Sequence, residues 1–155
     1  MSLIAPLLAR YDHAVRQLTG RLPESAVLVL VRLALGGVFW RSGQTKVEEG
    51  TWFQLTDSTY ELFRTEYAGV PLPPELAAVM ANAAEHVLPV LLVAGLFTRG
   101  AALGLLGMTL TIQFFVYPDA WWSEHALWSA LALVLAVRGA GLFSLDAILL
   151  RLRAK

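Results

Sequence analysis

Long apolar segments separated by short polar breaks dominate the sequence, at about residues 25–43, 75–97, 100–117 and 121–137. Each segment approaches the roughly 17–25 residues that a helix needs to cross about 30 Å of hydrocarbon. Stretches such as LGLLGMTLTIQFFVY and ALWSALALVLAV are apolar on nearly every side, whereas the helices of a soluble bundle would each keep a polar stripe. The pattern therefore predicts an all-α protein that forms a transmembrane four-helix bundle.

Two shorter segments have apolar residues on one face only. Residues 1–22 combine an apolar face, including Ile4 and Leu8, with basic residues elsewhere, which is typical of an amphipathic helix on the surface of a membrane. We expect this helix to lie on the cytoplasmic leaflet as a unit of its own. Residues 23–155 are then expected to form the four-helix membrane domain.

The second amphipathic segment lies between the first two apolar segments. It is expected to begin at a cap formed by Asp57 or Ser58, to turn Phe63 and Tyr67 to one face, and to stop near Gly69. We predict a short interfacial helix on the extracytoplasmic side, where it would cover the bundle as a lid.

The composition supports lipid as the solvent of this chain. Charged residues make up 15% of the sequence, against about 25% in typical soluble domains. The 12 basic and 12 acidic residues balance, which argues against a nucleic-acid partner. Because there are no cysteines, any redox role requires a bound cofactor or a partner protein.

The distribution of basic residues predicts the orientation. If the four segments alternate in direction, most basic residues fall on one side, and this side is expected to be cytoplasmic. These residues are Arg10, Arg16, Arg21, Arg99, Arg138, Arg151, Arg153 and Lys155. The sequence therefore predicts a multi-pass protein of a bacterial inner membrane with both termini in the cytoplasm.

Arg32 and Glu85 are the charged residues expected deepest in the bilayer. Arg32 would lie about 12 Å up the first crossing and Glu85 about 15 Å down the second. An isolated ion at such a depth costs at least about 2.5–3.5 kcal/mol, so opposite charges at one level should pair. We predict an Arg32–Glu85 ion pair, which is either part of a functional site or only a staple that fixes the register of the helices.

A polar pocket is expected around this pair. Asn82, Glu85 and His86 share one helical face, and Pro89 leaves the backbone carbonyl of Glu85 without its helical donor. The candidate ligand-binding residues are Arg32, Lys46, Asn82, Glu85, His86 and Gln113.

Histidine chemistry is not favoured by the spacing. No second ligand-type residue stands at metal-binding spacing from His86, so no metal site is predicted. His13 and His125 are expected at the membrane interface.

Several short motifs occur in the order and spacing of one family of small prokaryotic membrane proteins. They are RLALGGVFWRSGQTK (32–46), PLPPELAA (71–78), GLFTR (95–99), YPDAW (117–121) and LFSLD (142–146). From about Leu28 to Leu149 the chain resembles the DoxX family. Positions that match polar or glycine positions of the family are Arg32, Gly43, Lys46 and Glu85.

The resemblance implies a bacterial inner-membrane protein. Some related proteins are subunits of a thiosulfate:quinone oxidoreductase, and others are linked to membrane-associated responses to oxidative or thiol stress. This chain has Arg41-Ser42 where many members have His-Gly, and Gln113 where they have a histidine late in the third helix. These departures argue against a proton relay or a metal built on those histidines.

The leading hypothesis is an accessory subunit of a membrane redox system whose pocket binds a quinone-like head group or another small polar ligand. Arg32 or Lys46 would donate a hydrogen bond to the ligand, and Glu85 would accept a proton. No intrinsic cofactor is predicted. The chain lacks a nucleophile elbow, a phosphate loop and a dinucleotide fingerprint, so an oxidoreductase role would be that of a quinone-binding or non-catalytic subunit.

Two other functions fit the same sequence features. In the first alternative, the protein is a small permease or channel-like component in which the ion pair gates the passage of a solute. In the second, it is an assembly scaffold without a ligand. Expected partners are the lipid bilayer and a protein partner or a second copy of the chain.

Overall fold

The computed structural model describes residues 4–154, and nearly all of its regular secondary structure is helical. A single isolated bridge between Val47 and Leu55 is the exception. The helices are α1 (Ile4–Leu18), α2 (Arg21–Gln44), α3 (Asp57–Thr65), α4 (Pro74–Ala94), α5 (Thr98–Phe115), the short segments η1 (Pro118–Ala120) and η2 (Trp121–His125), α6 (Ala126–Arg138) and α7 (Leu145–Arg153). The prediction of an all-α protein is confirmed.

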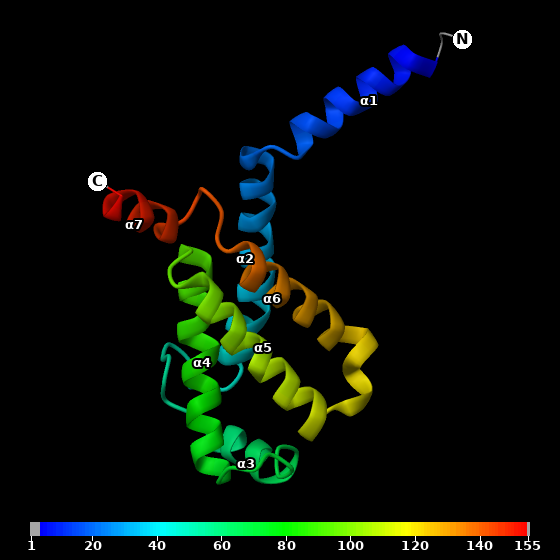
Figure 1. Ribbon diagram of the computed structural model, residues 1–155. Coiled ribbons are helices and arrows are strands. Elements are labelled where there is room, and N and C mark those ends of the chain that lie inside the picture. Colours follow the sequence, from blue (N-terminus) through cyan, green and yellow to red (C-terminus); the bar gives the residue numbers. More distant parts are fainter. Residues whose placement is uncertain (1–3, 155) are drawn as a thin grey trace.

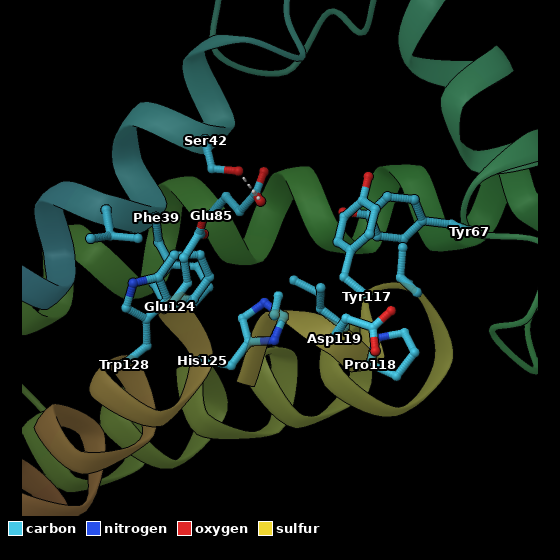
Figure 2. A pocket seen from close by; sticks show the side chains of 14 residues that line it. Phe39, Ser42, Tyr67, Glu85, Tyr117, Pro118, Asp119, Glu124, His125 and Trp128 are labelled. Atoms are coloured by element: carbon cyan, nitrogen blue, oxygen red, sulfur yellow. Dashed lines mark hydrogen bonds between the residues drawn. The ribbon is translucent and has the colours of Figure 1, made fainter. Parts of the chain in front are cut away.

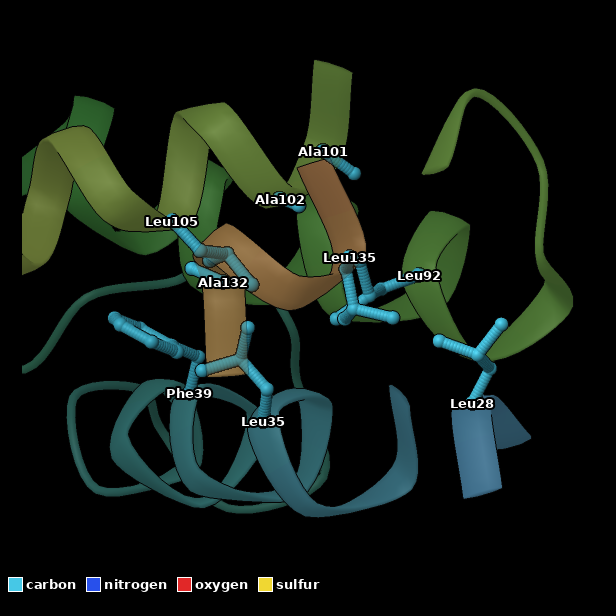
Figure 3. Close-up of a cluster of buried hydrophobic side chains, with 9 residues drawn as sticks. All are labelled: Leu28, Leu35, Phe39, Leu92, Ala101, Ala102, Leu105, Ala132 and Leu135. Atoms are coloured by element: carbon cyan, nitrogen blue, oxygen red, sulfur yellow. The ribbon is translucent and has the colours of Figure 1, made fainter. Parts of the chain in front are cut away.

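Four long helices lie side by side around one apolar core. α2 packs on α4, α4 on α5, α5 on α6, and α6 returns to α2 (Figure 1). Figure 3 shows the core. Its buried members are Leu28, Leu35, Phe39, Leu92, Ala101, Ala102, Leu105, Ala132 and Leu135. We call the two ends of this arrangement the α3 end and the α7 end, because these short helices lie at opposite ends (Figure 1).

Three helical segments are long and apolar enough to cross a membrane: Arg21–Gln44, Pro74–Ala94 and Pro118–Arg138. Their outer surfaces carry large exposed apolar side chains, such as Leu30 at 66% and Val137 at 69%. So much exposed apolar surface marks contact with lipid. These are the features of an integral membrane protein.

The third predicted crossing corresponds to α5, which has 18 residues and is not one of the three segments that are long and apolar enough to cross a membrane. Arg99 near its start and Gln113 near its end make it less apolar than those segments. The fourth predicted crossing begins earlier than expected, since η1 and η2 continue directly into α6.

The amphipathic segments form helices close to the predicted bounds. α1 projects away from the other helices (Figure 1) and exposes the apolar Ile4, Leu8 and Tyr11. The predicted segment 1–22 and the predicted domain 23–155 include residues 1–3 and 155, which lie outside the described residues. α3 begins at Asp57, and its N-cap is Thr56 instead of the predicted Asp57 or Ser58, because the Thr56 side chain accepts the hydrogen bond from the Thr59 N–H.

Two glycines bring α2 and α4 close together. A Cβ added at Gly36 would lie 3.1 Å from Val93 Cγ2, and one at Gly43 would lie 2.9 Å from His86 Cε1. Small residues permit such close helix packing in membranes. This contact sets which residues of α2 and α4 stand at the same level.

The α7 end is closed by a segment that the sequence analysis did not identify as a helix. The α7 residue Asp146 accepts hydrogen bonds from the N–H groups of Phe97 and Thr98, at 2.8 and 3.0 Å. These N–H groups belong to the start of α5, where helix ends leave donors unpaired. Asp146 therefore caps α5 from a distant part of the chain.

Gly43→Ala is expected to lower the stability of the protein. The added methyl group overlaps the buried His86 ring, and overpacking of this kind typically costs about 1–3 kcal/mol. Gly37→Ala is the matched control on the same helix, because a Cβ there meets nothing within 4 Å and the helix gains about 0.5–1 kcal/mol. Thermal unfolding in detergent should show a lower Tm only for Gly43→Ala, and equal effects of the two changes would contradict this packing.

Asp146→Asn is expected to reduce the acid sensitivity of the fold. Burial alone would raise the pKa of Asp146, but hydrogen bonds from Thr98 and Phe97 and the charge of Arg32 outweigh burial and lower it. A carboxylate with a lowered pKa stabilises the folded state above its ordinary pKa, and this contribution is lost as the pH falls through the lowered value. The difference in Tm between wild type and Asp146→Asn should therefore shrink below about pH 4, and a difference that stays constant from pH 7 to pH 3 would contradict the assignment.

Candidate ligand-binding site

A buried ion pair joins α4 to the end of α2. Lys46 Nζ lies 2.9 Å from Glu85 Oε1, and both side chains are more than nine-tenths buried. Lys46 Nζ also donates to the carbonyl oxygen and to the hydroxyl of Ser42, at 3.2 and 2.9 Å. The Ser42 hydroxyl in turn donates to Glu85 Oε1 at 2.9 Å. All three protons of the ammonium group are thus used within this triad.

The predicted Arg32–Glu85 pair is wrong. The Arg32 guanidinium donates to the backbone carbonyls of Val93 and Phe143, at 3.0 and 2.6 Å. Val93 lies eight residues beyond Glu85 on α4, which is about 12 Å along the helix. The prediction assumed that the two helices end at one level, whereas the end of α4 lies beside Arg32, halfway along α2.

Arg32 instead belongs to the closure of the α7 end. A positive charge is favourable at the C-terminal end of α4, where carbonyl groups lack helical donors. Gly95 ends α4 with a positive φ of 67°, and a Cβ there would lie 2.4 Å from Arg32 Nη1. The structure therefore separates Arg32 from the other five candidate residues.

Asn82 and His86 lie beside the ion pair, on the side of the loop that follows α2. His86 Nδ1 lies 2.9 Å from the Asn82 carbonyl oxygen, and His86 Nε2 lies 2.9 Å from the Gln44 side chain. The Asn82 amide donates to the Trp52 carbonyl oxygen at 3.1 Å. His86, with both ring nitrogens engaged and its side chain buried, thus joins α4 to the end of α2, whereas Asn82 holds the loop on α4.

Gln113 positions a histidine that the sequence analysis placed at the interface. Gln113 Nε2 donates to the Pro118 carbonyl oxygen at 2.6 Å, which leaves its Oε1 to accept from His125 Nδ1 at 2.7 Å. His125 is buried within the protein, with only 2% of this residue exposed. Its Nε2 is left as an acceptor without a protein partner among residues 4–154. The π-helical turn η2 directs the His125 side chain toward Gln113. Such a turn is often found at functional sites.

Two cavities adjoin Glu85. The first has a volume of about 490 Å³ and lies between α2, α5 and the η1–η2 turn (Figure 2). Glu85, Ser42 and His125 line it, together with the acidic residues Asp119 and Glu124 near its opening. The second has a volume of about 210 Å³. Tyr67, Glu85 and Ile112 line both cavities.

Glu85 is oriented by one of its two carboxylate oxygens. Oε1 accepts from Lys46 and Ser42, whereas Oε2 is buried without a hydrogen-bond partner in the described part of the chain. A buried polar atom without a partner costs about 1–3 kcal/mol, more when it is charged. The arrangement therefore offers a strong, preoriented acceptor to a ligand in the adjoining cavity.

Ser42 carried a signal that the sequence analysis did not use, because it precedes Lys46 by four positions, a spacing at which side chains meet on a helix. The buried position of His125 carried no such signal, because this residue follows a run of aromatic residues that resembles an interfacial belt. Among residues 4–154, no group of three histidine or acidic side chains is placed to hold a metal ion.

Lys46→Met is expected to destabilise the protein by about 3–5 kcal/mol, because it leaves the Glu85 carboxylate buried without its counter-ion. Lys46→Met combined with Glu85→Leu should cost clearly less than the sum of the two single changes. Arg64→Met is the control, because it breaks the exposed Arg64–Glu75 pair, which is worth at most about 1 kcal/mol. Unfolding in a denaturing detergent series measures all four variants, and additive effects of Lys46→Met and Glu85→Leu would refute the coupling.

The comparisons with known proteins agree with the helical pattern. The DoxX family model matches residues 27–118, from the second turn of α2 to the start of η1. This match ends before Leu149, where the resemblance was expected to end. No curated protein and no solved structure matches the chain significantly. Because the matched region covers more than half of the sequence, the chain belongs to the DoxX family.

Proposed function

We propose that the protein binds the polar head group of a quinone-like molecule in the cavity of about 490 Å³ beside Glu85, as an accessory subunit of a membrane redox system. The observation that carries this proposal is the unpaired Oε2 of Glu85. A purely structural ion pair gains nothing from a carboxylate oxygen left without a donor beside a cavity. A ligand that supplies the donor removes this cost.

The hydrogen-bonding character of the cavity favours the reduced form of such a molecule. Glu85 Oε2 and His125 Nε2 are both acceptors, and Asp119 and Glu124 add negative charge at the opening. Lys46, the nearest cation, is already saturated by Ser42 and Glu85. A hydroquinone, which presents O–H donors, fits this wall better than a quinone carbonyl does.

Glu85 also has a role when such a head group is oxidised. Each O–H that loses its proton needs a nearby base, and Glu85 lines the cavity. Because the chain contains no cysteine, the two electrons pass to a bound cofactor or to a redox centre of a partner protein.

In the proposed topology, α2, α4, α5 and α6 all cross the membrane. The two termini lie at the same end of the molecule (Figure 1), which agrees with an even number of crossings. Arginines concentrate at this α7 end, including Arg99, Arg138 and Arg151. By the positive-inside tendency this end faces the cytoplasm of a bacterial inner membrane, and the ligand cavity lies in the opposite half of the bilayer.

Glu85→Gln tests this function, because it keeps the shape of the side chain and removes its charge. The purified protein in nanodiscs should bind 2,3-dimethoxy-5-methyl-1,4-hydroquinone under anaerobic conditions, and Glu85→Gln should weaken binding about 10-fold or more, since a hydrogen bond to a charged group is worth about 1.5–3 kcal/mol. The dimethyl ether of the same compound lacks both O–H groups and should bind poorly to either protein. Equilibrium dialysis measures the dissociation constants.

The control is Glu75→Gln, which changes an exposed carboxylate at the start of the same helix. This variant should bind the hydroquinone as the wild type does. Equal binding of the hydroquinone by wild type and Glu85→Gln, with both proteins folded, would refute the proposed function.

A further inference from the structure

The second cavity beside Glu85 is almost entirely apolar. It has a volume of about 210 Å³ and lies between α3, α4 and α5. Its apolar lining residues include Phe63, Ala81, Ala84 and Met108, and its polar lining residues are Lys46, Tyr67, Glu85 and Thr111. At about 30 Å³ for a water-sized group, this volume holds roughly seven such groups. It is therefore large enough for a short hydrocarbon chain, and most of its lining is apolar.

The two cavities are arranged as one amphipathic site. They share Tyr67, Glu85 and Ile112 as lining residues, so Glu85 lies where the polar cavity meets the apolar one. A molecule with its head group at Glu85 can place an attached chain in the second cavity.

The apolar cavity also borders the lipid-facing surface. Leu72 and Met80 line it and are 42% and 52% exposed. In a membrane protein such exposed apolar side chains face hydrocarbon. A chain that extends beyond the cavity would therefore continue into the lipid rather than into water.

We propose that the ligand of this protein is an amphiphile with a single apolar chain, which lies in the cavity between α3, α4 and α5 while its hydrogen-bond-donating head group contacts Glu85. This inference rests on the proposed head-group site. It adds that the protein recognises the apolar chain of the ligand and that the ligand enters laterally from the bilayer.

The test compares two probes that differ only in the chain: 2,3-dimethoxy-5-methyl-1,4-hydroquinone and its 6-decyl derivative. Ala84→Phe fills the apolar cavity from α4 and does not line the polar one. In nanodiscs of fixed lipid content, Ala84→Phe should weaken binding of the decyl compound at least 10-fold and leave binding of the parent compound unchanged within twofold. Partitioning of the decyl compound into lipid is the same for wild type and variant, so it cancels in this ratio.

Thr111→Phe fills the same cavity from α5 and provides a second variant if Ala84→Phe does not fold. Val87→Phe adds the same ring to the exposed face of α4 and should change neither affinity. If wild type and both cavity variants bind the two probes with unchanged affinity, the chain-binding inference is overturned and the head-group site stands. Equal weakening of both probes by the cavity variants also overturns the inference. Failure of wild type to bind the parent compound removes the proposed function instead.

Discussion

The close packing of α2 against α4 through Gly36 and Gly43 is the contact on which the rest of the structure depends. It fixes the register of the two antiparallel helices, because side chains at these positions would push the backbones apart. In this register Lys46 reaches Glu85, and Arg32 reaches the last carbonyls of α4. Both charges that the sequence places within apolar helices obtain their partners from this one contact.

The buried charges form two separate groups with different properties. At the α7 end, Arg32 and Asp146 satisfy unpaired backbone groups at helix ends, which is a structural use of charge. At the α3 end, Lys46 and Glu85 neutralise each other but leave one carboxylate oxygen free beside a cavity. The second group combines a buried ion pair, a carboxylate oxygen without a hydrogen-bond partner among the described residues and two adjoining cavities, so we place the candidate site there.

The sequence was sufficient to predict the helices but not their relative levels. Hydrophobic segment lengths gave α2 and α4 to within about four residues, since helix length is set by the pattern itself. The partner of Glu85 was not predictable from depths counted from helix ends, because α2 extends well beyond the end of α4. Lys46, predicted only as a candidate ligand-binding residue, is the ion-pair partner of Glu85.

The inward position of His125 was also hidden in the sequence. The run YPDAWWSEH reads as an interfacial loop, and nothing in its composition indicates the π-helical turn that directs His125 toward Gln113. Gln113 was predicted only as a candidate residue of the polar pocket. Its role in holding His125 depends on a fold-back between α5 and η2 that only the three-dimensional structure reveals.

The long-range partners of Arg32 have a consequence for biosynthesis. The residues that complete its surroundings, Phe143 and Asp146, are more than 100 positions later in the chain. Translation proceeds from the N-terminus, so α2 and α4 enter the membrane while the ribosome has yet to make the segment that closes their shared end. Insertion of the apolar helices and final closure are thus separate events, and closure waits until Phe143 and Asp146 have left the ribosome.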